Sequence, residues 1–161
     1  MMPTRRRLFL ASSALTTLAA LRPVWAHHGW SGFDLTRPVY LEGRLARVSW
    51  RNPHAELDLD LRPDLKLPAD LASRNLPAQT APVDAAQLLK ITQLPTRRDR
   101  LWHIELAPLT RMDAWKVAPL TVGQTVALIG YTAEGEKGDP VLRAEWLFVD
   151  GKVVPLRSPP A

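Results

Sequence analysis

The feature that most constrains the fold is a strict alternation of apolar and polar residues over positions 54–61. The odd positions from Ala55 to Leu61 are all apolar, and the even positions from His54 to Asp60 are all polar. Successive side chains of a β-strand point to opposite faces, so this pattern predicts a strand with one buried and one polar face.

Five further segments have the composition of strands. Residues 39–50 precede an Arg-Asn-Pro turn and are expected to form a hairpin with 54–61. Within 39–50 the apolar positions change from odd to even just after Gly43, which predicts a bulge or a sharp coil in a long, bent strand. The other predicted strands cover 101–106, 125–131, 141–149 and 153–157.

Two short helices complete the predicted elements. One is expected over 110–117, between the third and fourth strands. The other is expected over 84–91, capped near Asp84, inside a proline-rich insertion at 62–100 that is otherwise predicted to be a surface insertion or flexible loop. The chain therefore predicts a single all-β domain over 39–157 with little helix, an OB-like barrel of five or six strands. A split sandwich is the alternative, because strand order is not readable from one sequence.

Residues 1–26 have the organisation of an export signal, and 27–38 form an irregular N-terminal arm. A basic start at 5–7 is followed by an uncharged, weakly apolar run at 8–21, and then by Val24-Trp25-Ala26, the small-x-small pattern before a cleavage site. The apolar run is too short for a permanent membrane span. Cleavage after Ala26 would leave a periplasmic protein that begins at His27.

The export route has two interpretations. Arg6-Arg7-Leu8-Phe9-Leu10 fits the twin-arginine consensus and accompanies an apolar run rich in Ala, Ser and Thr. A general-secretion signal with a chance pair of arginines is the alternative.

The charge of the chain changes when the predicted signal is removed. The full sequence has 21 Lys+Arg and 16 Asp+Glu, a formal charge of +5. Four of the arginines (5, 6, 7 and 22) and no acidic residues lie in 1–26, so their removal lowers the charge to +1. This near balance argues against a nucleic-acid partner. The chain has no cysteine, so any metal must be held by nitrogen and oxygen ligands.

The four histidines are the main candidates for chemistry. If His27 is the mature N-terminus, its amine and imidazole can chelate one metal ion together. A third nitrogen from a distant histidine would complete a T-shaped histidine brace, a set of donors that suits Cu(II) best and Ni(II) or Zn(II) next. His54 is the predicted third ligand, His28 is the local alternative, and Glu56 on the same face is a weaker candidate.

Other residues are expected to support such a site or the fold. His103, a weaker metal candidate, and Glu105 share the polar face of the predicted third strand and could act as outer partners of a ligand. Trp102 and Trp146 are in phase with apolar neighbours, which predicts core positions. The other candidates, Trp30, Trp50 and Trp115, are less constrained by the pattern. They are candidates to line a ligand groove, and ordinary core packing is the favoured alternative for them.

Several motifs together suggest a known family. Ala26-His27-His28-Gly29-Trp30 follows the predicted signal, and Trp50-Arg51-Asn52-Pro53-His54-Ala55 spans the predicted hairpin turn. The others are Trp102-x-x-Glu105, Leu120-x-x-Gly123-x-x-Val126 with Gly130-Tyr131, and Arg143-Ala144-Glu145 before Asp150-Gly151.

This combination, over nearly all of 27–157, resembles a family of small exported bacterial proteins that is catalogued as a domain of unknown function. The resemblance implies an exported, compact β domain and supplies no activity. The chain departs from the usual pattern in its longer insertion at 62–100 and in Met112-Asp113-Ala114-Trp115, which replaces a commoner Arg-Gly-Trp-like stretch.

Three functions are consistent with these residues. The leading hypothesis is a non-enzymatic periplasmic protein that binds copper(II) or a small ligand for storage, delivery or sensing, with His27, His54 and His28 as ligands. The second is a metal-free module that docks a protein or glycan of the cell envelope. The third is a copper-dependent redox enzyme, for which the sequence offers no catalytic residues, phosphate loop or dinucleotide fingerprint.

Overall fold

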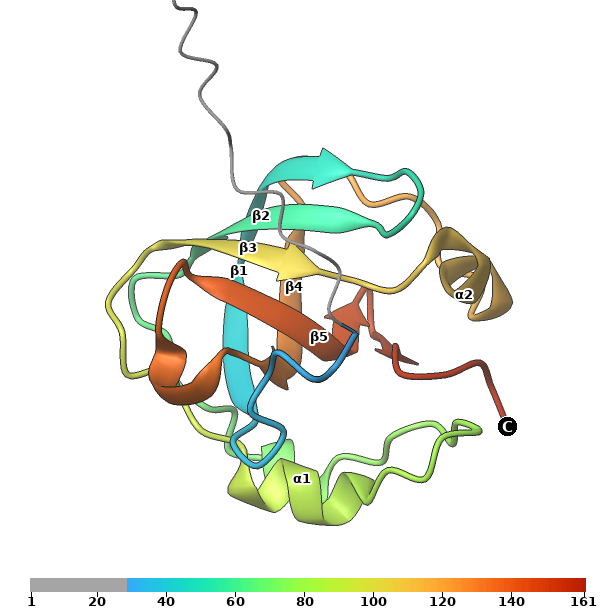
Figure 1. The fold of residues 1–161 in the computed structure, drawn as a ribbon, viewed down its shortest axis with the longest axis horizontal. Coiled ribbons are helices and arrows are strands. Elements are labelled where there is room, and N and C mark those ends of the chain that lie inside the picture. Colours follow the sequence, from blue (N-terminus) through green and yellow to red (C-terminus); the bar gives the residue numbers. More distant parts are fainter. Residues whose placement is uncertain (1–28) are drawn as a thin grey trace, which may run out of the picture.

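The computed structural model describes residues 29–161, and these form one β-barrel with short helices at its periphery (Figure 1). Within 29–161, no helix is both long and apolar enough to cross a membrane. The six strands are β1 (Val39–Ser49), β2 (Glu56–Leu61), β3 (Leu101–Glu105), β4 (Thr125–Tyr131), β5 (Val141–Val149) and β6 (Lys152–Pro155).

The strands form a closed five-stranded barrel with β6 as an additional strand. Their order is β3-β2-β1-β4-β5-β6, and a further pairing of β3 with β5 closes the barrel. All neighbours are antiparallel except β3 and β5, which are parallel. The predicted OB-like fold is confirmed, and the predicted strand positions agree with the observed ones to within two residues at most ends.

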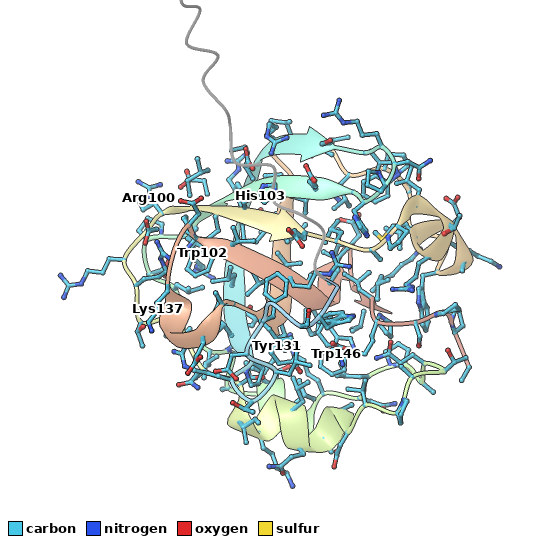
Figure 2. The ribbon with its side chains drawn as sticks, in the orientation of Figure 1. Arg100, Trp102, His103, Tyr131, Lys137 and Trp146 are labelled. Atoms are coloured by element: carbon cyan, nitrogen blue, oxygen red, sulfur yellow. The ribbon has the colours of Figure 1, made fainter. Side chains whose placement is uncertain are left out.

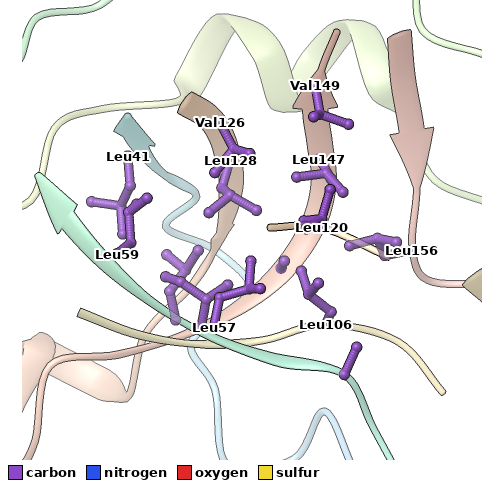
Figure 3. Packing of buried hydrophobic residues seen from close by; sticks show 14 of the residues in the cluster. Leu41, Leu57, Leu59, Leu106, Leu120, Val126, Leu128, Leu147, Val149 and Leu156 are labelled. Carbon is purple, nitrogen blue, oxygen red and sulfur yellow. The ribbon is translucent and has the colours of Figure 1, made fainter. Parts of the chain in front are cut away.

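The alternation at 54–61 gives β2 one buried and one polar face, as the sequence predicts. Ala55, Leu57 and Leu59 are completely buried, whereas the polar residues between them are partly exposed. The same holds on β3, where Trp102 and Ile104 are completely buried in the core of the barrel. Leucines fill much of the rest of the interior, including Leu41, Leu128 and Leu147 from the strands and Leu156 directly after β6 (Figure 3).

The irregularity in β1 lies slightly later than the sequence predicts. The register with β2 shifts between Leu45 and Arg47, two residues after the expected position at Gly43. Gly43 has a different role, because a Cβ atom there would overlap the backbone carbonyl of Asp60 on β2. The absent side chain lets β1 and β2 approach closely at the point where β1 also pairs with β4.

The two helices have distinct positions. The helix α1 (Ala85–Ile91) begins after Asp84, whose carboxylate accepts a hydrogen bond from the Gln87 amide, so the predicted N-cap is confirmed. The helix α2 (Leu109–Ala114) lies between β3 and β4, the helix position of the OB layout, and buries Met112 against the barrel core. It ends three residues earlier than the sequence predicts, and Lys116 takes a positive φ of 53°.

The proline-rich insertion packs on the barrel as a surface insertion, the first of its two expected states. Leu71 from the 3-10 helix η1 (Leu71–Ser73), and Leu88 and Leu89 from α1, are buried in a second apolar cluster outside the barrel. The barrel contributes to that cluster the residues Tyr40, Ile129, Tyr131 and Trp146. The apolar residues of the insertion that pack there are widely spaced among alanines and prolines, so no periodicity in the sequence indicates this packing.

A buried carboxylate joins the N-terminal arm to the insertion. Glu136, in the 3-10 helix η2 (Glu134–Glu136), forms an ion pair with Arg37 and accepts hydrogen bonds from the Thr96 and Arg97 amides at 2.9–3.0 Å. The amide of Asp34 also donates to Thr132 O at 2.9 Å. The arm that begins at residue 29 is therefore held against the barrel on its way to β1.

The close approach at Gly43 gives a direct test of the fold. We expect Gly43→Ala to lower the free energy of unfolding by about 1–3 kcal/mol, because the new methyl group must push β1 and β2 apart. Gly29→Ala is the matched control, since nothing lies within 4 Å of a Cβ atom at that position. Urea unfolding curves provide the measurement, and equal midpoints for the two variants would contradict this packing.

Candidate functional site

Only some of the metal ligands predicted from the sequence lie in the part of the chain that the structure describes. His27 and His28 lie outside the described residues. His54 is half-buried and lies between the turn at 51–53 and β2. The adjacent Ala55 extends the β2–β3 pairing, because its backbone forms hydrogen bonds with Leu106 and Ala107. An open hollow of about 400 Å³ adjoins His54 and Glu56 and is lined also by Ser49, Arg51, Asn52 and Pro53.

Polar residues form a continuous row on the outer face of β2 and β3. Glu56 is directly opposite Glu105, and Asp58 is directly opposite His103. Opposed residues on one face of an antiparallel pair have Cβ atoms about 4.5–5.5 Å apart. The predicted candidates Glu56, His103 and Glu105 are thus neighbours, and His54 lies beside Glu56 at the end of the row.

His103 already has a carboxylate partner. Its Nδ1 lies 3.1 Å from Asp58 Oδ1, and Arg47 binds the same carboxylate with Nη2 2.8 Å from Oδ1. The Arg47 hydrogen bond lowers the pKa of Asp58, and the hydrogen bond to His103 lowers it further, against the effect of burial. A histidine held in this way would bind a metal through Nε2, the arrangement usual for metal-bound imidazoles.

The described side chains do not form a metal centre by themselves. Among residues 29–161, no group of three or more His, Asp or Glu side chains has a geometry that could hold a metal ion. The row on β2 and β3 carries His54, Glu56, Glu105 and His103, spaced along the two strands rather than gathered at one point.

A second cluster surrounds Trp30, the first large residue after the predicted cleavage site. The Trp30 ring meets Tyr131 edge-on, with centroids 6.1 Å apart and planes at 85°. The guanidinium carbon of Arg157 lies 4.2 Å from the centre of the Trp30 ring, and that of Arg143 lies 5.4 Å away. Cation–π contacts of this kind are worth about 0.5–2 kcal/mol each. Trp30 is thus fixed on the barrel from several sides.

The Trp30 cluster stands on a buried ion pair. Glu145 is fully buried and accepts hydrogen bonds from Arg157 Nε at 2.8 Å and Nη2 at 2.6 Å. Gln79 from the insertion donates to the other carboxylate oxygen at 3.3 Å. Burial raises the pKa of Tyr131 to about 12, with a further contribution from Glu145, so its phenol stays neutral at physiological pH. In Figure 2, Tyr131 and Trp146 lie toward α1, whereas His103 lies toward Arg100.

Arg143 connects the two clusters. It is paired in register with Glu105 through the parallel β3–β5 contact, and its Nη1 lies 3.1 Å from Glu105 Oε2. The Arg143 side chain is 9% exposed and also faces the Trp30 ring. A continuous series of contacts therefore runs from Trp30 through Arg143 and Glu105 to Glu56.

The three tryptophans predicted to line a groove lie in different places. Trp30 packs on the outer cluster, whereas Trp50 and Trp115 pack on the barrel core. Trp115 follows α2, and its Nε1 donates to Ser158 O at 2.9 Å. The predicted core positions of Trp102 and Trp146 are confirmed, since both are fully buried.

Sequence reasoning did not identify Arg143, Glu145 and Arg157 as site residues. Their contacts join segments far apart in the chain, so no local spacing indicates them. A signal was nevertheless present, because Arg143 and Glu145 are the only charged residues in the apolar strand 141–149. A charge in a strand buried on both faces needs a partner, which predicts an ion pair.

In comparisons with known proteins, one family model matches part of the chain. Residues 15–66 match the model of a family of unknown function (DUF6152), which covers less than half of the chain. The matched segment includes Trp30, β1, the turn at 51–53 and His54. No curated protein and no solved structure matches the chain.

Breaking the buried ion pair between Glu145 and Arg157 should lower the stability strongly, and removing the second charge as well should restore most of the loss. We expect Arg157→Met to lower the free energy of unfolding by about 3–5 kcal/mol, because it leaves the Glu145 carboxylate buried without its cation. Glu145→Gln combined with Arg157→Met should recover most of this loss, since the buried charge is then gone.

Arg100→Met is the control, because Arg100 forms an ion pair with Asp60 in which the side chains are 67% and 47% exposed. Its cost should stay below about 1 kcal/mol. Chemical unfolding measures all four proteins, and equal losses for Arg157→Met and Arg100→Met would contradict the burial of the pair.

Proposed function

We propose that this protein is an exported, periplasmic OB-like barrel that binds Cu(II) through His27, which becomes the N-terminus when the signal is cleaved after Ala26. The His27 amine and imidazole supply two donors, and His54 supplies the third. His28 assists, and the row of carboxylates next to His54 offers negative charge to the cation. The role is storage, delivery or sensing of the metal rather than catalysis.

The observation that carries this proposal is the anchoring of Trp30. His27 precedes Trp30 by three residues, so their Cα atoms are at most about 10–11 Å apart. Trp30 rests on Arg143, which is one strand away from Glu105 and two strands away from Glu56. Two strand spacings amount to about 10 Å. The covalent reach of His27 from Trp30 is therefore similar to the separation of the strands that carry Arg143 and Glu56, which supports the proposal that His27 and His54 share one metal ion.

The available donor types support the choice of metal. Amine and imidazole nitrogens favour Cu(II) over the other divalent first-row metals, and the cysteine ligands that would favour Cu(I) or structural Zn(II) are missing from the sequence. Both imidazole and amine must be deprotonated to bind, so affinity should begin to fall as the pH drops below about 8, where the amine takes up its proton, and should fall more steeply below about 6.5, where the imidazoles do.

A second candidate function is a metal-free interaction module of the cell envelope. An open hollow of about 400 Å³ on the outer side of β4, β5 and β6 favours it. Glu42, Arg74, Phe148 and Lys152 contribute to its lining, so it offers both an aromatic surface and charges of both signs. This hollow involves none of the proposed copper ligands.

Export has its own test. We expect that protein expressed from the full sequence in a bacterium with both export routes is recovered from the periplasm with His27 as its first residue, because residues 24–26 match the cleavage pattern. Intact-mass measurement identifies the first residue. The double substitution Arg6→Lys/Arg7→Lys should stop export if the twin-arginine route is used, and recovery of the protein with residues 1–26 attached would contradict cleavage.

Copper binding tests the site directly. Protein that begins at His27 should bind one Cu(II) per chain. Protein that retains residues 24–26 before His27 should bind it at least about tenfold more weakly, because the amine that completes the chelate is then on another residue and the histidines are at positions 4 and 5, too far along for a new N-terminal chelate. His54→Asn should also weaken binding, since it removes the third nitrogen. Competition titration against a chelator of known affinity provides the measurement.

The matched control for His54→Asn is His103→Asn, which removes an imidazole from the same face but opposite Asp58, four positions along the strand from His54. Equal affinity of the processed protein and the protein that retains residues 24–26 would contradict the brace. No Cu(II) binding by the processed protein would leave the interaction module as the better account.

A further inference from the structure

A small cleft with an apolar lining lies between the segment that follows α2 and the turn that joins β5 to β6. Its volume is about 130 Å³, and Trp115, Leu120, Val149 and Val154 supply apolar surface to it. A cavity of about 150 Å³ accommodates a benzene ring. This cleft is partly open to solvent, so it can take one ring, or a short branched chain, with a polar substituent left at the opening.

Hydrogen bonds hold the walls of the cleft in place. Trp115 Nε1 donates to Ser158 O at 2.9 Å, which fixes the indole. Gln124 Nε2 donates to Asp150 Oδ2 at 2.9 Å, which joins the turn before β4 to the turn between β5 and β6. Because the cleft is formed in advance, a ligand that enters it has few side chains to order.

Lys116, an exposed residue that lines the cleft, has a backbone conformation that favours glycine. The helix α2 ends in a Schellman motif, in which the Val117 amide donates to Met112 O and the Lys116 amide donates to Asp113 O. Glycine is usual at the Lys116 position of this motif, because the residue there is left-handed, and Lys116 has a φ of 53°. Non-glycine residues held in this conformation cluster at ligand sites, which points to a use for the lysine side chain.

Two ammonium groups give the opening of the cleft a positive charge. Lys116 and Lys152 both line the cleft and both are exposed. None of the ion pairs among residues 29–161 involves either lysine. Asp150, the one acidic residue among the described residues that line the cleft, is bound by the Gln124 amide. Each ammonium group is on a flexible four-carbon stem, so both can approach an anion at the opening.

We propose that this cleft binds a small organic monocarboxylate, with its apolar body against Trp115 and its carboxylate between Lys116 and Lys152. The volume and the apolar lining select the body of the ligand, and the two ammonium groups select its charge. The site lies wholly within residues 115–154, so it is independent of the proposed copper function and of the position at which the signal is cleaved.

The first test compares three probe compounds in NMR titrations of the protein that begins at His27. Phenylacetate has both the ring and the carboxylate, phenylacetamide replaces the charge by a neutral amide, and acetate lacks the ring. We expect phenylacetate to bind with a dissociation constant of about 0.1–1 mM and to shift the signals of the Trp115 indole N–H and the Leu120 and Val154 amides. The other two compounds should bind about tenfold more weakly. A chelator is present throughout, so that a bound metal ion cannot hold the carboxylate.

The second test separates ligand binding from stability. Lys116→Gly should raise the midpoint of urea unfolding, because glycine takes the left-handed conformation without strain. The same variant should bind phenylacetate about threefold more weakly, since one cation is lost, and addition of Lys152→Met should bring the loss to about tenfold. Lys90→Met is the matched control, because Lys90 is an exposed lysine of α1 outside the cleft, and its affinity should be unchanged.

Three results would overturn this assignment. The first is equal affinity for phenylacetate and phenylacetamide, and the second is equal affinity of the Lys116→Gly/Lys152→Met variant and the unaltered protein. The third is a set of shifted signals centred outside residues 115–154. The tripeptide Gly-Gly-Phe presents the same ring and carboxylate at a peptide end, and much tighter binding of this tripeptide than of phenylacetate would assign the cleft to a peptide C-terminus and not to a small acid.

Discussion

The parallel pairing of β3 with β5 is the constraint on which the arrangement of the candidate site depends. It closes the barrel, and it also places Glu105 in register with Arg143. Without that closure, β2 and β3 would form one edge of an open sheet, and the Trp30 cluster on β5 would lie at the other. Because the two edges meet, Trp30 of the N-terminal arm lies on Arg143, which pairs with Glu105 on the outer face of β3. Barrel closure thus serves both the core and the site.

The cost of this arrangement is concentrated in a few buried charges. Glu145 is fully buried, and Arg143 nearly so, in a strand that is otherwise apolar. Each is compensated by one specific partner, Arg157 and Glu105 respectively. Apolar residues at these positions would pack as well, and replacing buried ion pairs by apolar groups is often neutral or stabilising. We interpret the charges as a means of fixing the arm and the C-terminal segment in one arrangement on the barrel.

The strands and the barrel interior could be predicted from the sequence because their signals are local. The alternation over 54–61 depends on neighbouring positions alone, and so do the runs of β-forming residues at 125–131 and 141–149. The observed bounds of β4 and β5 are as predicted. The N-cap at Asp84 is equally local. The predicted position of the bulge in β1 is two residues too early. The sequence shows where the apolar–polar alternation of β1 is interrupted, whereas the bulge lies where the register with β2 shifts.

The packing of the insertion and the surroundings of Trp30 were beyond the same reasoning. The apolar residues of the insertion are widely spaced among alanines and prolines and give no period, so their close packing on the barrel is not indicated by the sequence. Trp30 was predicted to line a groove, and its contacts with Arg143 and Arg157 depend on the order of strands, which a single sequence does not supply. The candidate ligands His27 and His54 follow from chemistry and from the predicted cleavage, and their proximity stays a prediction.

The central claim is that His27 brings a metal to the outer face of β2 and β3 beside Trp30. Paramagnetic broadening of backbone amide signals by substoichiometric Cu(II), recorded on protein that begins at His27, tests it most directly. The account predicts that signals of Trp30, Glu56 and Glu105 broaden first, while those of Lys116 and Asp150 stay sharp. Broadening centred on any other part of the barrel, or equal broadening throughout, would contradict it.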